Sequence, residues 1–296
     1  MVPLFEIILL NYLVIFCLGG AVSQKLENLS GVKKIVAISS GKGGVGKSTV
    51  TANLAAALSA QGLRVGVLDA DIYGPSQAMM FGVPAGTRPQ TAEEKYFIPV
   101  VAHGIQTMSI SYLIDEDTPM VWRGPMVSSA LQQLLMQTQW DNLDVLLIDM
   151  PPGTGDIQLT LSQKVPVDGA IVVTTPQDIA LLDAKKGIEM FRKVDIPVLG
   201  IIENMSMHIC SNCGHVDPIF GEGGGDKMAE QYQTKLLGQL PLAMPIRVQA
   251  DSGTPIVIAE PESEYANLYK SVAASVSDVL ANQTQAEVPF INIMDD

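Results

Sequence analysis

The chain has 296 residues, 47% of them hydrophobic and 17% charged, which is enough for one large domain with a substantial core. The formal net charge of −13 at pH 7 argues against a nucleic-acid partner, because neutralising phosphates requires clustered Lys and Arg. With only three cysteines, Cys17, Cys210 and Cys213, the chain cannot form a disulfide framework. We therefore expect a protein of a reducing compartment such as the cytoplasm.

The first 22 residues are strongly apolar and long enough for a single membrane span. They lack a basic start and a clear cleavage motif, which disfavours a cleaved signal peptide. Lys25, Lys33 and Lys34 follow, and they would keep the rest of the chain on the cytoplasmic side of an anchor. Residues 1–23 are interpreted either as a membrane anchor or as an extension from an upstream start site.

Beyond this segment, apolar runs with strand character alternate with runs of helical spacing over one domain, residues 24–281. The stretch 82–118 is less regular and is predicted to hold a loop and a short hairpin. Residues 282–296 are predicted to be a mobile tail. The alternation predicts an α/β fold with a doubly wound, mostly parallel sheet that binds ligands at the carboxyl ends of its strands. The predicted strands are residues 35–39, 65–69, 105–110, 145–149, 170–174 and 198–202, and the predicted helices are residues 48–60, 126–140, 179–191 and 264–280.

The first predicted strand leads into the octapeptide GKGGVGKS at positions 41–48, which matches the P-loop pattern G-x-x-x-x-G-K-[ST]. Glycines let backbone N–H groups converge on phosphate oxygens, and the N-terminus of the following helix adds a partial positive charge. We expect Lys47 to reach the β- and γ-phosphates of ATP and the Ser48 hydroxyl to hold Mg²⁺. The predicted nucleotide-binding residues of this loop are Gly41, Lys42, Gly43, Gly44, Val45, Gly46, Lys47, Ser48 and Thr49.

Two other interpretations of this loop are weaker. The same glycines match the dinucleotide-binding pattern G-x-G-x-x-G, and Asp69 lies at the distance expected for a ribose contact. That pattern leaves Lys47 and Ser48 without a role. A glycine-rich turn without a ligand would not need two lysines and four glycines within eight residues.

Carboxylates follow two of the predicted strands. Asp149 ends an apolar run in the position of a Walker B carboxylate, which orients Mg²⁺ directly or through water. The alternative is a strand-end carboxylate that caps a loop. Asp71 is the candidate for orienting the attacking water, and Asp69 could instead support Mg²⁺ or the P-loop. The loop 153–156 is predicted to sense the γ-phosphate and to move on hydrolysis.

Two further features follow the last predicted strand. The amide of Asn204 suits the adenine edge, although a turn asparagine explains this residue equally well. The C-x-x-C pair Cys210 and Cys213 places two thiolates on one tight turn, which suits zinc or an iron–sulfur cluster. Such sites normally need four ligands, which two chains around a twofold axis could supply, while His208 and His215 leave a single-chain zinc site open. A redox dithiol and a pair of incidental buried cysteines are the other interpretations.

A second lysine, Lys42, directly follows the first glycine of the loop. This arrangement resembles the deviant Walker A motif of the MinD, ParA and nitrogenase iron-protein group of P-loop NTPases, the SIMIBI class. The resemblance implies that Lys42 reaches across a dimer interface to the nucleotide of the partner. The alternative is a solvated loop lysine. With Lys47, Asp71 and Asp149, Lys42 makes up the predicted catalytic set.

Several motifs in the same order resemble the Mrp/ApbC family of ATP-dependent iron–sulfur cluster carriers, over about residues 31–280. The resemblance implies a homodimer with a labile [4Fe–4S] cluster bridged by Cys210 and Cys213 of each chain. It also implies slow ATP hydrolysis coupled to transfer of the cluster to apo-proteins. Many bacterial members carry a small domain before the P-loop body, whereas here the apolar segment stands in that place. The motifs are SSGKGGVGKST, LDADIYGPS, IDMPPGTGD, ENMS ahead of C-x-x-C, and ADSGTPIV.

A second class of function is a MinD/ParA-like positioning ATPase that binds a membrane or partner proteins as a dimer. Such a protein would normally use a basic amphipathic helix at its C-terminus, whereas this chain ends in the acidic sequence Ile293-Met294-Asp295-Asp296. The C-x-x-C pair favours the carrier, while the apolar N-terminus leaves a membrane role open. An ATPase with a structural zinc at the cysteine pair is the third alternative.

Overall fold

The computed structural model describes residues 29–93, 95–114, 124–155, 158–159, 165, 167–210 and 212–283. The apolar segment 1–22, Asp156 and the predicted tail beyond Gln283 lie outside these ranges. Nine strands of the described part form one sheet, and β3 (Gln90–Ala92) and β4 (Tyr96–Ile98) form a separate hairpin. The strands of the sheet are β1 (Val32–Ser39), β2 (Val65–Asp69), β5 (Val100–Ala102), β6 (Ile105–Ser109), β7 (Leu143–Asp149), β8 (Gly169–Thr174), β9 (Val198–Ile209), β10 (Val216–Asp217) and β11 (Leu236–Leu242).

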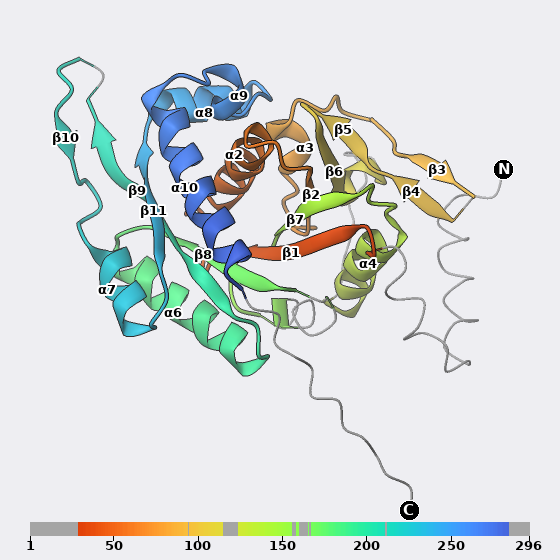
Figure 1. Cartoon of the computed structure of the whole chain (residues 1–296), viewed down its shortest axis with the longest axis horizontal. Coiled ribbons are helices and arrows are strands. Elements are labelled where there is room, and N and C mark those ends of the chain that lie inside the picture. Colours follow the sequence, from red (N-terminus) through yellow and green to blue (C-terminus); the bar gives the residue numbers. More distant parts are fainter. Residues whose placement is uncertain are drawn as a thin grey trace, which may run out of the picture.

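The sheet is mostly parallel, as Figure 1 shows. Its strand order is β10-β9-β8-β1-β7-β2-β6-β5, and β11 pairs with β9. The short strands β5 and β10 pair antiparallel with β6 and β9, and the remaining strand pairs are parallel. β1 lies between β7 and β8, so the loop that leaves its carboxyl end opens into the crevice where such sheets bind ligands.

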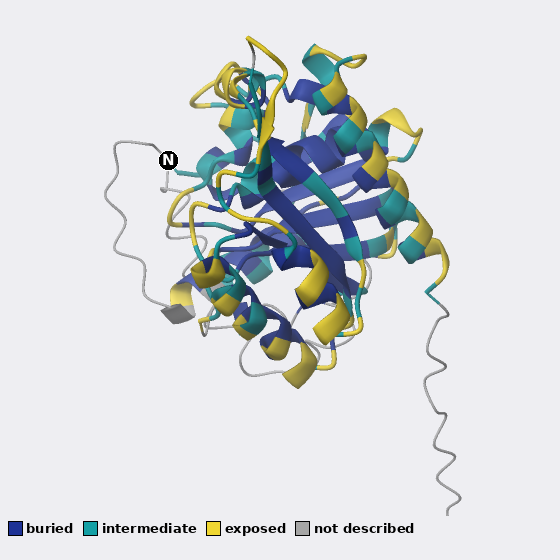
Figure 2. Ribbon diagram, turned by 90° about the vertical axis from the view of Figure 1, so that its left-hand side faces the viewer, coloured by how far each residue is buried: buried dark blue, intermediate teal, exposed yellow. Residues whose placement is uncertain are grey.

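Helices cover both faces of the sheet, whose central strands are buried (Figure 2). α2, α9 and α10 pack on one face, and α4, α6 and α7 pack on the other. Val36 and Ile38 of β1 face the first core, while Ile35 and Ala37 face the second, as strand alternation requires. This double burial explains why the strands are continuous apolar runs in the sequence. The helices are α2 (Lys47–Ala60), α3 (Gln77–Met80), α4 (Gly124–Gln137), α6 (Asp178–Lys193), α7 (Gly224–Gln231), α8 (Met244–Asp251), α9 (Ile256–Ala259) and α10 (Glu264–Ala281).

The predicted α/β fold is confirmed, since every predicted strand and helix is present and the hairpin expected within 82–118 is β3–β4. Several predicted boundaries are wrong. The helix predicted for 126–140 ends at Gln137, and the strand predicted for 198–202 continues to Ile209. The apolar run ends near Ile202, but pairing with β11 and β10 extends β9 well beyond it. β11 and helices α7 to α9 were not predicted.

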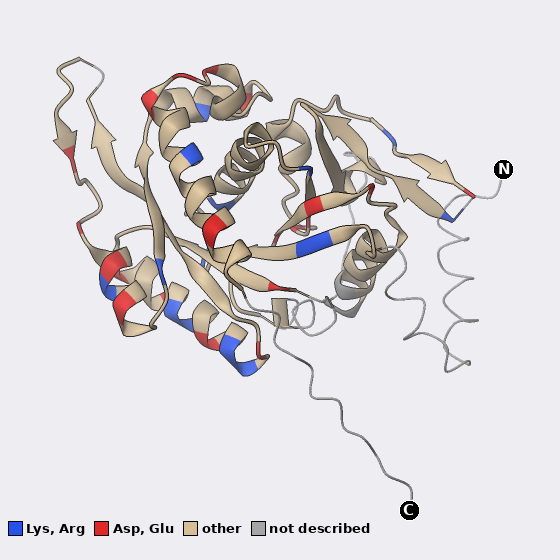
Figure 3. Ribbon diagram, viewed as in Figure 1, with Lys and Arg blue, Asp and Glu red and all other residues tan. Residues whose placement is uncertain are grey.

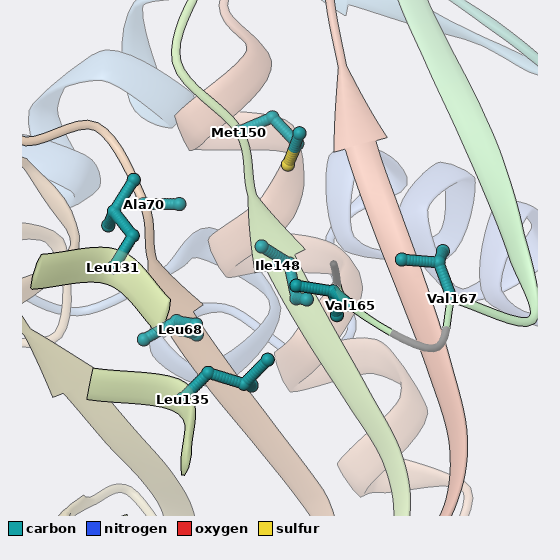
Figure 4. A pocket seen from close by; sticks show the side chains of 8 residues that line it. All are labelled: Leu68, Ala70, Leu131, Leu135, Ile148, Met150, Val165 and Val167. Atoms are coloured by element: carbon teal, nitrogen blue, oxygen red, sulfur yellow. The ribbon is translucent and has the colours of Figure 1, made fainter. Parts of the chain in front are cut away.

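A small pocket lies between α4 and the sheet (Figure 4). Its lining consists of apolar side chains, so it suits hydrophobic packing and not a charged ligand. It lies on the face opposite α2, the helix that follows the P-loop. The lining residues are Leu68, Ala70, Leu131, Leu135, Ile148, Met150, Val165 and Val167.

Positions of basic and acidic residues are interspersed along the outer helices, most visibly on α6 (Figure 3). Lys186 pairs with Asp183 on this helix at 2.9 Å, and Arg192 lies 3.8 Å from Glu189. These pairs are exposed and typical of a solvated helix face. No helix in the described ranges is both long enough and apolar enough to cross a membrane.

Candidate functional site

The P-loop leaves the carboxyl end of β1 and ends at the start of α2. Gly46 is the N-cap of this helix, and no side chain caps the helix end. The first turn of α2 carries no acidic residue. Because the first N–H groups of a helix have no partner within the helix, this end offers donors and a partial positive charge to an anion. The predicted P-loop residues thus form an uncapped helix start of the kind that binds phosphate.

Two glycines of the loop lie where a larger residue would collide with its surroundings. A Cβ atom on Gly41 would lie 2.1 Å from the backbone carbonyl carbon of Asp183 in α6. A Cβ atom on Gly46 would lie 2.3 Å from Nδ2 of Asn204, and Gly46 has a φ of 80°, in the left-handed region. The loop is therefore enclosed by α6 on one side and by β9 on the other.

We expect Gly46→Ala to weaken ADP binding about 10-fold, because strain of roughly 1–3 kcal/mol would displace the loop or Asn204. Isothermal titration calorimetry measures this affinity. Gly44→Ala is the matched control, since Gly44 has a similar φ of 82° and nothing lies within 4 Å of the added Cβ atom. Equal affinities for the two variants would contradict a specific effect of the Asn204 contact.

Lys47 and Asp149 form a buried ion pair between α2 and the end of β7. Lys47 Nζ lies 2.5 Å from Asp149 Oδ1, and the two side chains are 6% and 0% exposed. The hydroxyl of Thr51, one turn along α2, donates to the same oxygen at 3.1 Å. Gln77 Nε2 donates to Asp149 Oδ2 at 2.8 Å. The ammonium is thus held beside the P-loop by a carboxylate that it can exchange for phosphate.

Sequence reasoning missed Thr51 and Gln77. The position of Thr51 beside Lys47 could have been predicted, because a residue four positions after Lys47 lies on the same face of a helix. The position of Gln77 could not, because it comes from the separate helix α3, which packs near α2.

The oxygens around Lys47 suit a small divalent cation. Ser48 Oγ lies 3.3 Å from Lys47 Nζ, so the Ser48 hydroxyl and the Asp149 carboxylate contact the same ammonium. Both are hard oxygen donors of the kind that Mg²⁺ prefers. Gln77 Oε1 is buried beside them and accepts no hydrogen bond from any described residue. The donor set fits Mg²⁺, whose assignment to Ser48 and Asp149 stays a prediction.

Asp69 ends β2, in register with Asp149 on the neighbouring strand. Asp69 Oδ2 accepts the N–H groups of Ser76 and Gln77 at 2.9 and 3.0 Å, and Oδ1 accepts that of Asp71 at 3.1 Å. Complete burial, reinforced by the nearby Asp149 charge, raises the pKa of Asp69 to about 7. Asp69 therefore anchors the loop after β2, and these bonds occupy the oxygens that the dinucleotide-binding alternative would need for a ribose.

The other two predicted catalytic residues, Asp71 and Lys42, are partly exposed. Asp71 Oδ1 accepts the N–H of Gly74 at 3.2 Å, which holds the carboxylate within the loop after β2. The Lys42 ammonium takes part in no ion pair within the described ranges. The role predicted for Lys42 would require a second chain and that of Asp71 a bound nucleotide, so both assignments stay predictions.

Asn204 links β9 to the P-loop. It is buried, and its Nδ2 donates to the carbonyl of Val45 at 2.8 Å. It lies inside β9, so the interpretation as a turn asparagine is wrong. The contact with adenine stays a prediction. The next residue, Met205, has a φ of 55°, which is uncommon outside glycine and interrupts the regular strand just after this contact.

The C-x-x-C pair forms the turn of the β9–β10 hairpin, which projects past the neighbouring strands (Figure 1). The N–H of Cys210 donates to the carbonyl of His215, and the N–H of Gly214 donates to that of Cys210, both at 2.9 Å. Cys210 is half-buried, Cys213 is exposed, and no disulfide joins them. The backbone N–H of Cys213, and to a smaller extent that of Asn212, donates a hydrogen bond to the Cys210 sulfur. These bonds lower the pKa of the Cys210 thiol. The turn therefore stabilises the Cys210 thiolate, the form that binds metals, relative to that of a free cysteine.

This exposure contradicts the interpretation as incidental buried cysteines. In the part of the chain that the structure describes, no group of three or more His, Cys, Asp or Glu side chains could hold a metal. His208 and His215 therefore do not complete a single-chain zinc site in this conformation. Cys210 follows Asn204 along the same hairpin arm, about 20 Å away at the usual rise of a strand.

Fold and site together define a P-loop nucleotide-binding protein of the MinD/ParA type. A nucleotide-binding protein from Archaeoglobus fulgidus, solved in complex with ADP, matches with a TM-score of 0.72 and 35% identity, covering 83% of this chain and 96% of that one. The cell division ATPase MinD from Pyrococcus furiosus matches with a TM-score of 0.63, covering 83% of this chain and 99% of that one. At 22% identity, this second likeness supports the fold alone.

Within this class, the comparisons also show the family to which the chain belongs. A family model described as ParA, NUBPL iron-transfer P-loop NTPase, matches residues 31–277. An iron–sulfur cluster carrier protein of Pseudomonas fragi is 63% identical over 251 residues, which are 85% of this chain and 88% of that protein. The chain belongs to the NUBPL iron-transfer family of P-loop NTPases, which confirms the resemblance noted in its motifs.

Proposed function

We propose that this chain binds and hydrolyses ATP and carries an iron–sulfur cluster on Cys210 and Cys213 for delivery to apo-proteins. One observation carries the proposal. Strand β9 joins the P-loop, through Asn204, to a turn that presents two accessible thiols. The family and the name of the Pseudomonas fragi relative support the same pairing of an NTPase with iron–sulfur cargo.

In the nucleotide half of the site, phosphate replaces Asp149 as the partner of Lys47. The loop N–H groups and Lys47 then bind the phosphates, and Asn204, which contacts the loop at Val45, would contact the base. Ser48 and Asp149 would hold Mg²⁺, which neutralises charge on the phosphates when bound. Asp71, on a loop anchored by Asp69, orients the attacking water.

In the cargo half, each chain supplies two thiolates, whereas a [4Fe–4S] cluster normally has four protein ligands. A twofold-symmetric dimer would supply all four ligands, because the cysteine pair of a second copy meets that of the first at one interface. The chain would thus act as a homodimer with one cluster. At the hairpin tip Cys213 is exposed and Cys210 is half-buried, which leaves both thiols accessible to a second chain.

Two elements support coupling between the halves. Lys42 is partly exposed beside the phosphate site and, in the proposed dimer, reaches the nucleotide of the partner. Asn204 ties β9 to the loop that must adjust when phosphate binds, and the left-handed Met205 follows it directly. Nucleotide binding would therefore change the dimer interface and the thiol turn together. The strength with which the cluster is held would then depend on the nucleotide state.

The composition supports a cytoplasmic place of action, since free thiols and ATP belong to a reducing compartment. Recipients are apo-proteins that need a cluster, and nucleic acid has no part in the proposal.

Attachment to a membrane through residues 1–22 is the alternative to a start-site extension. Fractionation of the full chain before and after a high-salt wash would decide between them.

Anaerobic reconstitution of the full chain tests the cargo half. We expect about four iron and four sulfide per pair of chains, together with the native mass of a dimer. A cluster held by a monomer would contradict the bridged arrangement. Stoichiometric zinc with no affinity for iron would instead establish the structural-zinc alternative and leave an ATPase with different cargo.

A further inference from the structure

Gln77 is a buried amide between the P-loop helix and the end of β7. It begins α3 and is 1% exposed. Its Nε2 donates to the carbonyl of Ser48 at 3.1 Å and to Asp149 Oδ2 at 2.8 Å. Its backbone N–H donates to Asp69 Oδ2 at 3.0 Å. Both ends of the residue are therefore held beside the proposed magnesium ligands.

These contacts determine which way the amide faces. Ser48 O and Asp149 Oδ2 are acceptors, so the atom between them must be the NH₂ nitrogen. The remaining atom, Gln77 Oε1, is buried and receives no hydrogen bond from any described residue. Buried acceptors are normally paired, because leaving one without a donor costs free energy. A donor that arrives with a ligand would satisfy it.

ATP binding changes what holds Asp149. In the structure the carboxylate is bonded by Lys47 and Thr51 at Oδ1 and by Gln77 at Oδ2. When Lys47 turns to the phosphates, Thr51 and Gln77 remain as partners of the carboxylate. Mg²⁺ usually keeps several of its waters, and each of these waters is a hydrogen-bond donor.

We propose that Gln77 is a positioning residue for the metal–nucleotide complex. Its Nε2 holds Asp149 in place after Lys47 has left, and its Oε1 accepts a hydrogen bond from a metal-bound water. The inference rests on the ATP binding in the proposed function and is independent of the cysteine pair. The hydrogen bond from the Gln77 backbone N–H to Asp69 fixes the start of α3, and it thereby fixes where the Gln77 amide lies.

The test separates metal binding from nucleotide binding. Mn²⁺ is titrated into the full chain saturated with ADP and followed by electron paramagnetic resonance, and ADP affinity is measured by calorimetry in EDTA. Gln77→Met keeps the side-chain length but removes both polar atoms. Outer partners of metal ligands typically contribute 10–100-fold to metal affinity, so we expect Mn²⁺ binding about 10–100-fold weaker. ADP affinity in EDTA should stay within about 2-fold.

Gln106→Met is the matched control. The Gln106 amide bridges β6 to the backbone of Asp141 through two hydrogen bonds of 2.9 and 3.0 Å, outside the P-loop. This variant should leave both affinities unchanged. If Gln77→Met does not fold, Gln77→Asn serves instead, since it keeps the amide but withdraws it by one methylene. It should show the same metal-specific loss to a smaller degree.

Unchanged Mn²⁺ affinity in the Gln77 variant would overturn the inference. So would an equal loss of ADP affinity with and without metal, because that pattern marks a merely structural residue. Either result, with normal ADP binding by the wild-type chain, would leave the proposed function standing. A wild-type chain that binds no ADP would overturn the ATPase half and the inference together.

Discussion

Replacing Lys47 by alanine is expected to abolish ATP hydrolysis and to weaken ATP binding by about 100-fold, since hydrogen bonds from a charged group contribute roughly 1.5–3 kcal/mol. Lys47 is a buried cation at the start of α2, where we propose that the phosphates bind, and its partner in the structure is Asp149 at 2.5 Å. Calorimetry and steady-state phosphate release measure the two effects. Wild-type hydrolysis in this variant would contradict the P-loop assignment.

The same substitution should destabilise the nucleotide-free protein. It leaves the Asp149 carboxylate buried without its cation, in register with the buried Asp69. Removing one partner of a buried ion pair typically costs about 3–5 kcal/mol of unfolding free energy, which urea denaturation can measure. Lys186→Ala is the control, because its pair with Asp183 is similarly short at 2.9 Å but the lysine is 67% exposed. That variant should lose less than about 1 kcal/mol.

Lys42→Ala distinguishes the role of Lys42 from that of Lys47. Lys42 is partly exposed and does not take part in the Lys47–Asp149 pair. ATP binding and stability should therefore stay close to wild type, while hydrolysis falls, because the proposed target of Lys42 is the nucleotide of the partner. Equal hydrolysis rates in Lys42→Ala and wild type would remove the argument for a role across the interface.

The double variant Cys210→Ala/Cys213→Ala is expected to bind no iron after anaerobic reconstitution, compared with about four iron per dimer in the wild-type chain. It should also lose any dimer that depends on the cluster. ATP affinity should stay within about 2-fold of that of the cluster-free wild-type chain, because the thiols lie about 20 Å from Asn204 along the hairpin arm. Iron analysis, native mass and calorimetry give the three readouts.

Cys17→Ala is the control for this experiment, since it removes the third cysteine of the chain and leaves the C-x-x-C turn intact. It should reconstitute as the wild type does. A cluster retained by the double variant would mean that Cys210 and Cys213 are not the ligands. Loss of ATP affinity in the double variant would show instead that the two sites are not structurally separable.

The sequence was sufficient for elements whose contacts are local. The P-loop depends on a strand, a glycine-rich turn and a helix start that follow one another, so its pattern is complete within 41–48. The buried strands were predictable because burial on both faces requires a continuous apolar run. The thiol turn needed only the spacing of Cys210 and Cys213, since a tight turn brings the two together.

Strand β9 shows where this reasoning stops. Its apolar part ends before the buried polar residues Glu203 and Asn204, so periodicity predicts a strand end there. In the structure, Glu203 accepts bonds from Gly225 N and Gln239 Nε2, both at 2.7 Å, and Asn204 donates to Val45. Polar residues persist inside the strand because distant elements supply their partners, and no local pattern records those partners.

By itself, therefore, the sequence determined the α/β class, the phosphate-binding loop and the thiol pair, because neighbouring residues complete each of them. Only the tertiary structure decided how the parts meet. Lys47 and Asp149 are 102 residues apart, and Gln77 and Asp149 are 72 apart. These groups come together because β1, β2 and β7 end at one edge of the sheet, with Asp69 and Asp149 in register. Register between strands depends on the packing of both cores, which is a property of the whole fold.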